Sequence, residues 1–197
     1  MRPYSFTPAL LATAVAAIVA SPAFAQDTTK LSEESRAVAA DFANRLGAEL
    51  KKELSAGSPE SAIKVCKSVA PDIAAQLSLA HGWRVSRVSL KPRNPMLGTA
   101  DAWEQNVLAS FDERAAKGED PTKIEYSEIV AEPQGSYFRY MKALPVAPLC
   151  TQCHGAGDAV PPNVKVRIAA EYPMDKASGY SVGQIRGAIT VKRPLER

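Results

Sequence analysis

The residues that could do chemistry gather in one pentapeptide, Cys150-Thr151-Gln152-Cys153-His154. The whole chain holds only 3 cysteines and 2 histidines, and most of them fall in this stretch. Two thiols separated by two residues and followed directly by a histidine form the attachment pattern of a c-type haem. The thiols can form thioether bonds to the two vinyl groups of one porphyrin, and the histidine can bind the iron from the proximal side. The pattern therefore predicts one covalent haem c, held by Cys150, Cys153 and His154.

Two other uses of the pentapeptide fit the residues less well. A redox-active dithiol needs no neighbouring histidine, and it usually opens the helix of a βαβ unit. A structural zinc ion needs four ligands, and the adjacent side chains of Cys153 and His154 cannot easily close on one ion. Because the chain contains a single C-x-x-C-H pattern, the sequence also excludes a multihaem cytochrome.

The start of the chain predicts export. Arg2 is the only charged residue before position 27, residues 9–20 are apolar, and Ala23-Phe24-Ala25 resembles a cleavage site. We therefore predict a signal peptide over residues 1–25 and a single periplasmic domain over residues 26–197, in the compartment where haem c is attached. An uncleaved N-terminal anchor is the alternative. No other long apolar run follows, so we expect no stable membrane span after signal cleavage.

The charge balance bears on partners. The chain carries 24 Lys and Arg residues against 21 Asp and Glu residues. Loss of Arg2 with the signal peptide brings the two counts closer, so the mature protein is nearly neutral overall. Such a balance argues against nucleic-acid binding, which depends on a strongly basic surface. The sequence also lacks a serine nucleophile motif and a partnered carboxylate pair, so we do not expect an enzyme.

Cys66 is the thiol that remains once the haem has used the other two. An unpaired thiol in an oxidising compartment calls for an explanation. From the residues alone, Cys66 could be an inert core residue, part of an intermolecular disulfide or an iron ligand. Other possible iron ligands are weaker, because a histidine before a helix-ending glycine is typical of a surface cap and methionine usually fills core gaps. These weaker candidates are His81, Met96, Met141 and Met174.

The elements that must position these residues follow from the hydrophobic periodicity. Helices are predicted over residues 31–54, 58–80, 102–116 and 162–172, and strands over 83–90, 124–131, 136–144 and 185–191. In the second helix Cys66 lies on the apolar face, and Pro71 is predicted to kink the helix because it removes one backbone hydrogen bond. Helices first, followed by strands in hairpin-like pairs, predict an α+β domain with an antiparallel sheet.

Four segments resemble a known family. They are Ala62-Ile63-x-x-Cys66 with Ala70-Pro71-x-Ile73-Ala74; Val88-Ser89-Leu90-Lys91-Pro92-Arg93-Asn94-Pro95 leading to Asp101-Ala102-Trp103-Glu104; Cys150-x-x-Cys153-His154-Gly155; and Gly179-Tyr180-x-x-Gly183-x-Ile185-Arg186-Gly187-Ala188. In order and spacing they are similar to the Tll0287-like haem-c family, formerly a domain of unknown function. The resemblance implies a PAS-like antiparallel sheet with N-terminal helices packed around one covalent haem. It also implies His154 and Cys66 as the axial ligands of the iron.

The resemblance also implies a choice of functions. The family occurs as free periplasmic proteins and as the sensor part of larger signalling chains. No kinase, cyclase or transmembrane transmitter follows the domain here, so a signalling role would need a separate partner protein. We expect a sensor of redox state or of a gas such as NO or CO, with a ligand switch at Cys66. The alternative is a periplasmic electron-transfer cytochrome c; a six-coordinate iron argues against peroxidase chemistry.

Basic residues near the haem would pair with its propionates, because carboxylates buried at a haem edge need cationic partners. Lys91 and Arg93, in a loop framed by prolines, are the predicted partners, and a solvated basic turn is the alternative. Arg139 and Arg186 are weaker candidates of the same kind. Aromatic side chains could pack on the porphyrin or fill the core. The aromatic candidates are Trp103, Tyr137, Phe138 and Tyr140.

Overall fold

The computed structural model describes residues 27–57 and 59–195 of the chain. The predicted signal peptide lies outside the described residues, and the prediction of one domain over residues 26–197 stays a prediction. Among the described residues, none of the helices combines the length and the apolar character that crossing a bilayer requires.

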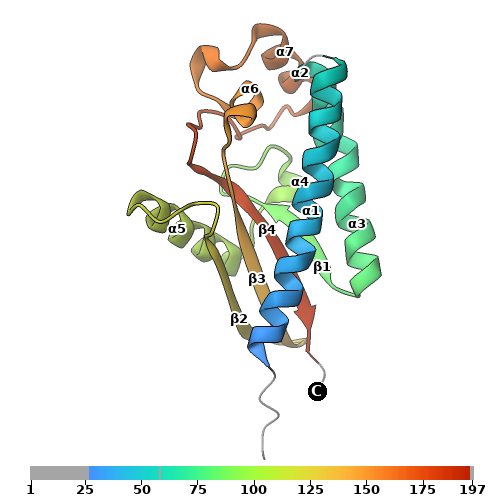
Figure 1. Ribbon diagram of the computed structural model, residues 1–197, viewed down its shortest axis with the longest axis vertical. Helices are drawn as coiled ribbons and strands as arrows, with labels where there is room; N and C mark the ends of the chain where they lie inside the picture. Colours follow the sequence, from blue (N-terminus) through green and yellow to red (C-terminus); the bar gives the residue numbers. More distant parts are fainter. Residues whose placement is uncertain (1–26, 58, 196–197) are drawn as a thin grey trace, which may run out of the picture.

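An antiparallel sheet forms the centre of the described chain (Figure 1). Its strands are β1 (Arg84–Val88), β2 (Glu125–Glu132), β3 (Gly135–Pro145) and β4 (Ile185–Pro194), in the order β1-β4-β3-β2. Strands β2 and β3 form the predicted hairpin, and β1 lies at the edge beside β4. The predicted α+β class with an antiparallel sheet is confirmed, and all the predicted strands are present. The finer likeness to PAS domains stays a prediction.

Helices α1 (Thr28–Ala56) and α3 (Ala70–His81) cover one face of the sheet (Figure 1). Apolar side chains of both helices pack against those of β1, β3 and β4, and Phe42 of α1 is 1% exposed. Helix α1 begins before residue 31, the predicted start, because its cap is Asp27. The Asp27 carboxylate accepts hydrogen bonds from the backbone N–H groups of Thr29 and Lys30, at 3.0 and 3.2 Å.

The helix predicted over residues 58–80 is divided into three parts. Helix α2 (Pro59–Lys64) leads into a π-helix, η1 (Val65–Val69), and α3 follows directly. Pro71, near the start of α3, cannot donate a backbone hydrogen bond to the carbonyl four residues earlier. The wider π turn before it accommodates this loss, since the N–H of Ala70 bonds to the carbonyl of Val65, five residues back. Where the sequence predicts a kink at Pro71, the structure has a π-helix just before this residue, and Cys66 lies on that π-helix.

Helix α5 (Ala102–Ala116) packs on the opposite face of the sheet and matches its predicted bounds. Its start is fixed by a capping box. The Asp101 carboxylate accepts from the N–H of Glu104, and the Glu104 carboxylate accepts from the N–H of Asp101, each at 2.9 Å. Because the two residues of the capping box are three positions apart, the local sequence is sufficient to predict where α5 begins.

A buried ion pair joins α5 to the sheet. Arg139 of β3 lies 3.2 Å from the carboxylate of Glu104 and 2.7 Å from that of Asp101, and the Thr190 hydroxyl donates to Glu104 at 2.9 Å. The Arg139 guanidinium also lies 4.2 Å from the ring centroid of Trp103. Arg139 is therefore a structural cation beneath α5, where it faces these carboxylates.

Substitution Glu104→Ala is expected to lower the free energy of unfolding by about 3 kcal/mol, because it removes a buried partner of Arg139. The measurement is urea unfolding followed by far-UV circular dichroism. Glu113→Ala is the control, since Glu113 is an exposed residue of the same helix, 71% exposed in its ion pair with Lys117. If both variants lose the same free energy of unfolding, the buried ion pair makes no specific contribution to stability.

Helix α2 and the segment that carries the pentapeptide lie at one end of the sheet (Figure 1). This end contains α6 (Thr151–His154) after a 3₁₀ turn (Pro148–Cys150), and α7 (Pro162–Glu171) after a second such turn (Gly157–Ala159). A separate apolar cluster links α7 to α2 through Ile63, Val164 and Ile168. The short helix α4 (Pro95–Gly98) follows β1. The contact between α7 and α2 brings the pentapeptide segment close to the π-helix that carries Cys66.

Candidate cofactor site

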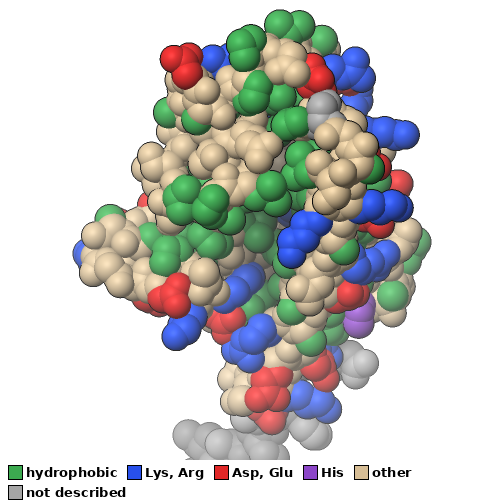
Figure 2. All heavy atoms as spheres, turned by 45° about the horizontal axis from the view of Figure 1, so that its top comes forward, with side chains coloured by type: hydrophobic (Ala, Val, Ile, Leu, Met, Phe, Trp, Pro, Cys, Tyr) green, Lys and Arg blue, Asp and Glu red, His purple; other side chains and the backbone are tan. Residues whose placement is uncertain are grey.

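A cavity of about 310 Å³ lies between the helices of one face, strand β1 and the end of the sheet that carries α6. Its lining is mainly apolar, and its volume is at the lower end of the range found for small-molecule sites. Both Cys66 and His154 line it, although they are far apart in the sequence. Figure 2 shows hydrophobic side chains gathered around a hollow on this side of the molecule, with Lys and Arg side chains near them along α1.

The two thiols of the pentapeptide lie close to each other. Cys150 ends the 3₁₀ turn and Cys153 belongs to α6, so that the two are one helical turn apart and share a face. Both are free thiols and half-buried. Burial is the main cause that raises the pKa of the Cys153 thiol; Arg93 opposes it, and the nearby Cys66 and Cys150 add smaller increases. The three cysteines of the chain therefore lie in one neighbourhood.

Neither Cys150 nor Cys153 lines the cavity of His154 and Cys66. Cys153 borders an adjoining hollow of about 510 Å³. The phenol of Tyr172, which follows α7, lines both spaces, and burial raises its pKa to about 12. The structure thus brings Cys66, His154 and Arg93 into one cavity and places Cys153 in the next.

The imidazole of His154 is held in one orientation. Its Nδ1 lies 2.7 Å from the carbonyl oxygen of Ala177 and 3.1 Å from the Nε of Arg186. One nitrogen cannot donate to the carbonyl and accept from the guanidinium at once, and the shorter contact requires a proton on Nδ1. That proton leaves the lone pair of Nε2 free, and Nε2 has no hydrogen-bond partner among the described residues. This tautomer is the one that binds a metal through Nε2.

The environment of His154 keeps the ring neutral. Burial is the main cause, and the positive charges of Arg186 and Arg93 add to it, which lowers the pKa of His154 to about 2. Burial likewise lowers the pKa of Arg186, to about 10. A neutral imidazole with a free lone pair is a competent ligand at any ordinary pH.

Gly155 allows the turn after His154 to close. A Cβ at this position would lie 2.5 Å from the carbonyl oxygen of Thr151 and 2.8 Å from the Cβ of Ala159, closer than real Cβ contacts allow. The turn is also held by the segment that follows α7. The N–H of Gly179 donates to the carbonyl of Gly155 at 3.0 Å, and that of Tyr180 donates to the carbonyl of His154 at 2.9 Å.

The two predicted propionate partners have different surroundings. Arg93 lines the cavity, but its Nε bonds to the carboxylate of Asp175 at 3.2 Å and its Nη2 donates to the carbonyl of Cys153 at 2.6 Å. Lys91 is not part of the lining; its Nζ donates to the carbonyl of Ser178 at 3.0 Å. Through these two bonds, Arg93 therefore connects the pentapeptide to the segment that follows α7. The pairing of Lys91 and Arg93 with haem carboxylates stays a prediction.

The aromatic lining differs from the sequence prediction. Phe42 and Tyr172 line the cavity, whereas the predicted aromatic residues do not. Phe138 and Tyr140 are fully buried in the core under α1, and Trp103 packs on Arg139. The residues that do not reach the cavity are Trp103, Tyr137, Phe138 and Tyr140. Among the weaker metal candidates, His81, Met96, Met141 and Met174 also lie outside the lining.

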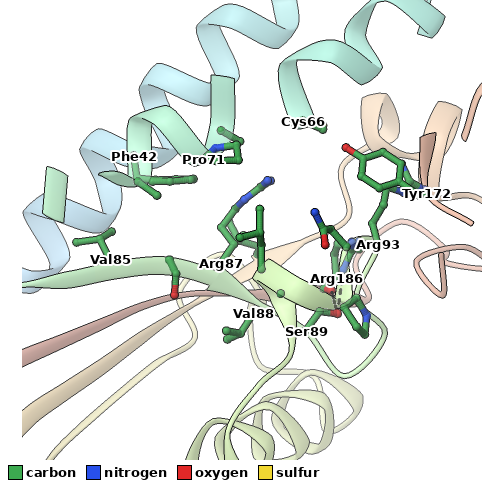
Figure 3. A pocket seen from close by; sticks show the side chains of 18 of the residues that line it. Phe42, Cys66, Pro71, Val85, Arg87, Val88, Ser89, Arg93, Tyr172 and Arg186 are labelled. Atoms are coloured by element: carbon green, nitrogen blue, oxygen red, sulfur yellow. Dashed lines mark hydrogen bonds between the residues drawn. The ribbon is translucent and has the colours of Figure 1, made fainter. Parts of the chain in front are cut away.

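Arg87 is the functional candidate that sequence reasoning missed. It lies on β1 and lines the cavity, and in Figure 3 its side chain rises between Phe42 and Pro71 on one side and Tyr172 on the other. The sequence signal for Arg87 is the alternation of side chains between the two faces of a strand. Arg87 is two residues after the buried Val85, and side chains two apart in a strand share a face. A cation at a core-facing position suggests a buried anionic partner.

The chain is similar to known proteins in its sequence family and in its fold. The family model Tll0287-like: Tll0287 matches residues 13–194. The chain belongs to the Tll0287-like family. Among solved structures, this Tll0287-like protein is similar to the crystal structure of the cyanobacterial heme-protein Tll0287, with 22% identity and a TM-score of 0.59. The match covers 88% of this chain and 98% of that one, so the two share their fold over nearly the whole length. No match was found among curated protein sequences.

Proposed function

We propose that this protein binds one haem c in the periplasm and senses redox state or a gas such as NO or CO. The observation that carries the proposal is the shared cavity of His154 and Cys66, with a free Nε2 on one and a free thiol on the other. Cys150 and Cys153 would form the covalent thioether links. Membership of the Tll0287-like family supports the proposal, and so does the similarity to a crystal structure of a cyanobacterial heme-protein.

The residues present fit a haem iron. An imidazole nitrogen and a thiol sulfur are both iron ligands, and His154 and Cys66 would supply one of each to a haem. The apolar lining, with Phe42 and Tyr172, suits the face of a porphyrin. Among the described residues, no group of three or more His, Cys, Asp or Glu could hold a bare metal ion. A pair of donors in an apolar cavity therefore matches haem better than a simple metal site.

The haem, when bound, supplies an iron that cycles between the ferric and ferrous states. His154 would hold it through Nε2, while the carbonyl of Ala177 keeps the imidazole in place. The anionic sulfur of Cys66 would be attracted more strongly to a ferric than to a ferrous charge, so reduction would weaken the hold of Cys66 on the iron. Release of Cys66 would free the π-helix between α2 and α3, which provides the two-state element that a sensor requires.

A periplasmic electron-transfer cytochrome c is the second candidate, and one surface feature favours it. Met96 is 91% exposed, and Leu97, which also lines the cavity, is 56% exposed. An apolar rim beside a cofactor is suited to brief docking of a redox partner protein. In this case the iron would keep both axial ligands in both oxidation states.

Optical spectra of the purified holoprotein separate these functions. They are recorded oxidised, reduced, and reduced under CO. For the sensor, we expect a low-spin thiolate-type ferric spectrum that changes on reduction, and binding of CO by the reduced protein. If the spectra indicate the same iron ligands before and after reduction, and do not change under CO, the result would contradict the sensor and favour the electron carrier. A protein purified without covalent haem would contradict both.

A further inference from the structure

The cavity contains more positive charge than the protein neutralises. Three arginines line it, namely Arg87, Arg93 and Arg186. Arg93 has a carboxylate partner in Asp175. Arg87 and Arg186 form no ion pair with any described residue. Two unneutralised guanidinium groups beside an apolar cavity are costly, because buried charges require a counterion.

Arg186 is held but not neutralised. Its Nη1 donates to the hydroxyl of Ser89 at 2.9 Å and to the carbonyl of Lys91 at 3.3 Å. Both acceptors are uncharged, so these bonds orient the guanidinium without balancing its charge. They leave Nη2 available at the edge of the cavity, near His154.

Arg87 is less constrained. Its Cζ lies 5.7 Å from the ring centroid of Phe42, and its side chain forms no hydrogen bond with the described residues. Figure 3 shows the guanidinium pointing into the cavity, between the π-helix that carries Cys66 and the strand. All of its donors are therefore free for a ligand that enters this space.

We propose that Arg87 and Arg186 bind the two propionate carboxylates of the haem. This inference rests on the proposed haem binding. A haem presents two carboxylates on one edge, which equals the number of unpaired arginines in the cavity. Arginine can bind a carboxylate through two parallel hydrogen bonds, and such pairs are strongest where water is excluded. The predicted partners are less suitable, since Arg93 already faces Asp175 and Lys91 lies outside the lining.

The test compares Arg87→Gln with Arg84→Gln in the full-length holoprotein. Arg84 lies on the same strand and is exposed, so its substitution removes the same charge outside the cavity. The readouts are the midpoint potential and the resonance Raman band of propionate bending, which reports hydrogen bonding to the carboxylate. We expect Arg87→Gln to lower the potential, because loss of a nearby cation stabilises the ferric state, and to shift the band. Arg84→Gln should do neither, and Arg186→Gln should shift the band.

The outcomes are distinguishable. A wild-type potential and a wild-type propionate band in Arg87→Gln would overturn the inference while leaving haem binding intact. Absence of covalent haem from the wild-type protein would overturn the proposed function instead. If Arg87→Gln takes up no haem, Arg87→Lys decides: a shifted propionate band supports the pairing, because lysine cannot bind a carboxylate through two parallel bonds, and an unshifted band overturns it.

Discussion

Substitution Cys66→Ser is expected to abolish the thiolate-type ferric spectrum and to raise the midpoint potential of the holoprotein. Cys66 lines the same cavity as His154. A thiolate donates negative charge to iron and stabilises the ferric state, so its loss favours the ferrous state. The measurement is optical absorption of the ferric protein together with a potentiometric titration.

The control for this experiment is Ser68→Ala. Ser68 is an exposed residue of the same π-helix, so its substitution tests whether any change in this turn alters the haem. We expect its spectrum and its potential to match those of the wild type. If Cys66→Ser also matches the wild type while its far-UV circular dichroism is native, Cys66 is a packing residue and not a ligand.

Substitution of both Cys150 and Cys153 by alanine is expected to eliminate covalent haem completely. Each thiol would form one of two thioether bonds, so each single variant should keep one bond. The measurement is the mass of the denatured protein, with extraction of haem by acidified acetone. The wild type should retain its haem through extraction, and the double variant should release all of it.

Cys66→Ala serves as the control, because it removes the third thiol of the same neighbourhood without touching the pentapeptide. Its haem should remain covalently attached. Covalent haem in the double variant, or its loss in Cys66→Ala, would contradict the assignment of the attachment thiols.

Local patterns predicted most elements of the fold. The start of α5 follows from a local cap at Asp101, and the β2–β3 hairpin follows from two strand-like runs around 133–135. These signals depend on neighbours within a few residues. The predicted start of α1 at residue 31 is wrong, because Asp27 supplies the hydrogen bonds that cap the helix.

The cavity depends on contacts that no local pattern contains. Arg93 meets Asp175, which is 82 residues away, and this pairing leaves Arg87 and Arg186 as the unpaired cations. The tautomer of His154 is set by Ala177, which follows α7. Phe138 and Tyr140, which the sequence offers as haem neighbours, belong to the core under α1 because β3 is covered on both faces, while Phe42 and Tyr172 line the cavity.

The sequence by itself determined which residues can carry the chemistry. The spacing in Cys150-x-x-Cys153-His154 is a covalent constraint within one turn, and Cys66 is the single thiol left over. Only the tertiary structure decided which residues share a cavity, how the imidazole is oriented and which arginines lack a carboxylate. The physical reason is that bonding within a turn depends on spacing along the chain, whereas burial and charge pairing depend on which distant segments pack together.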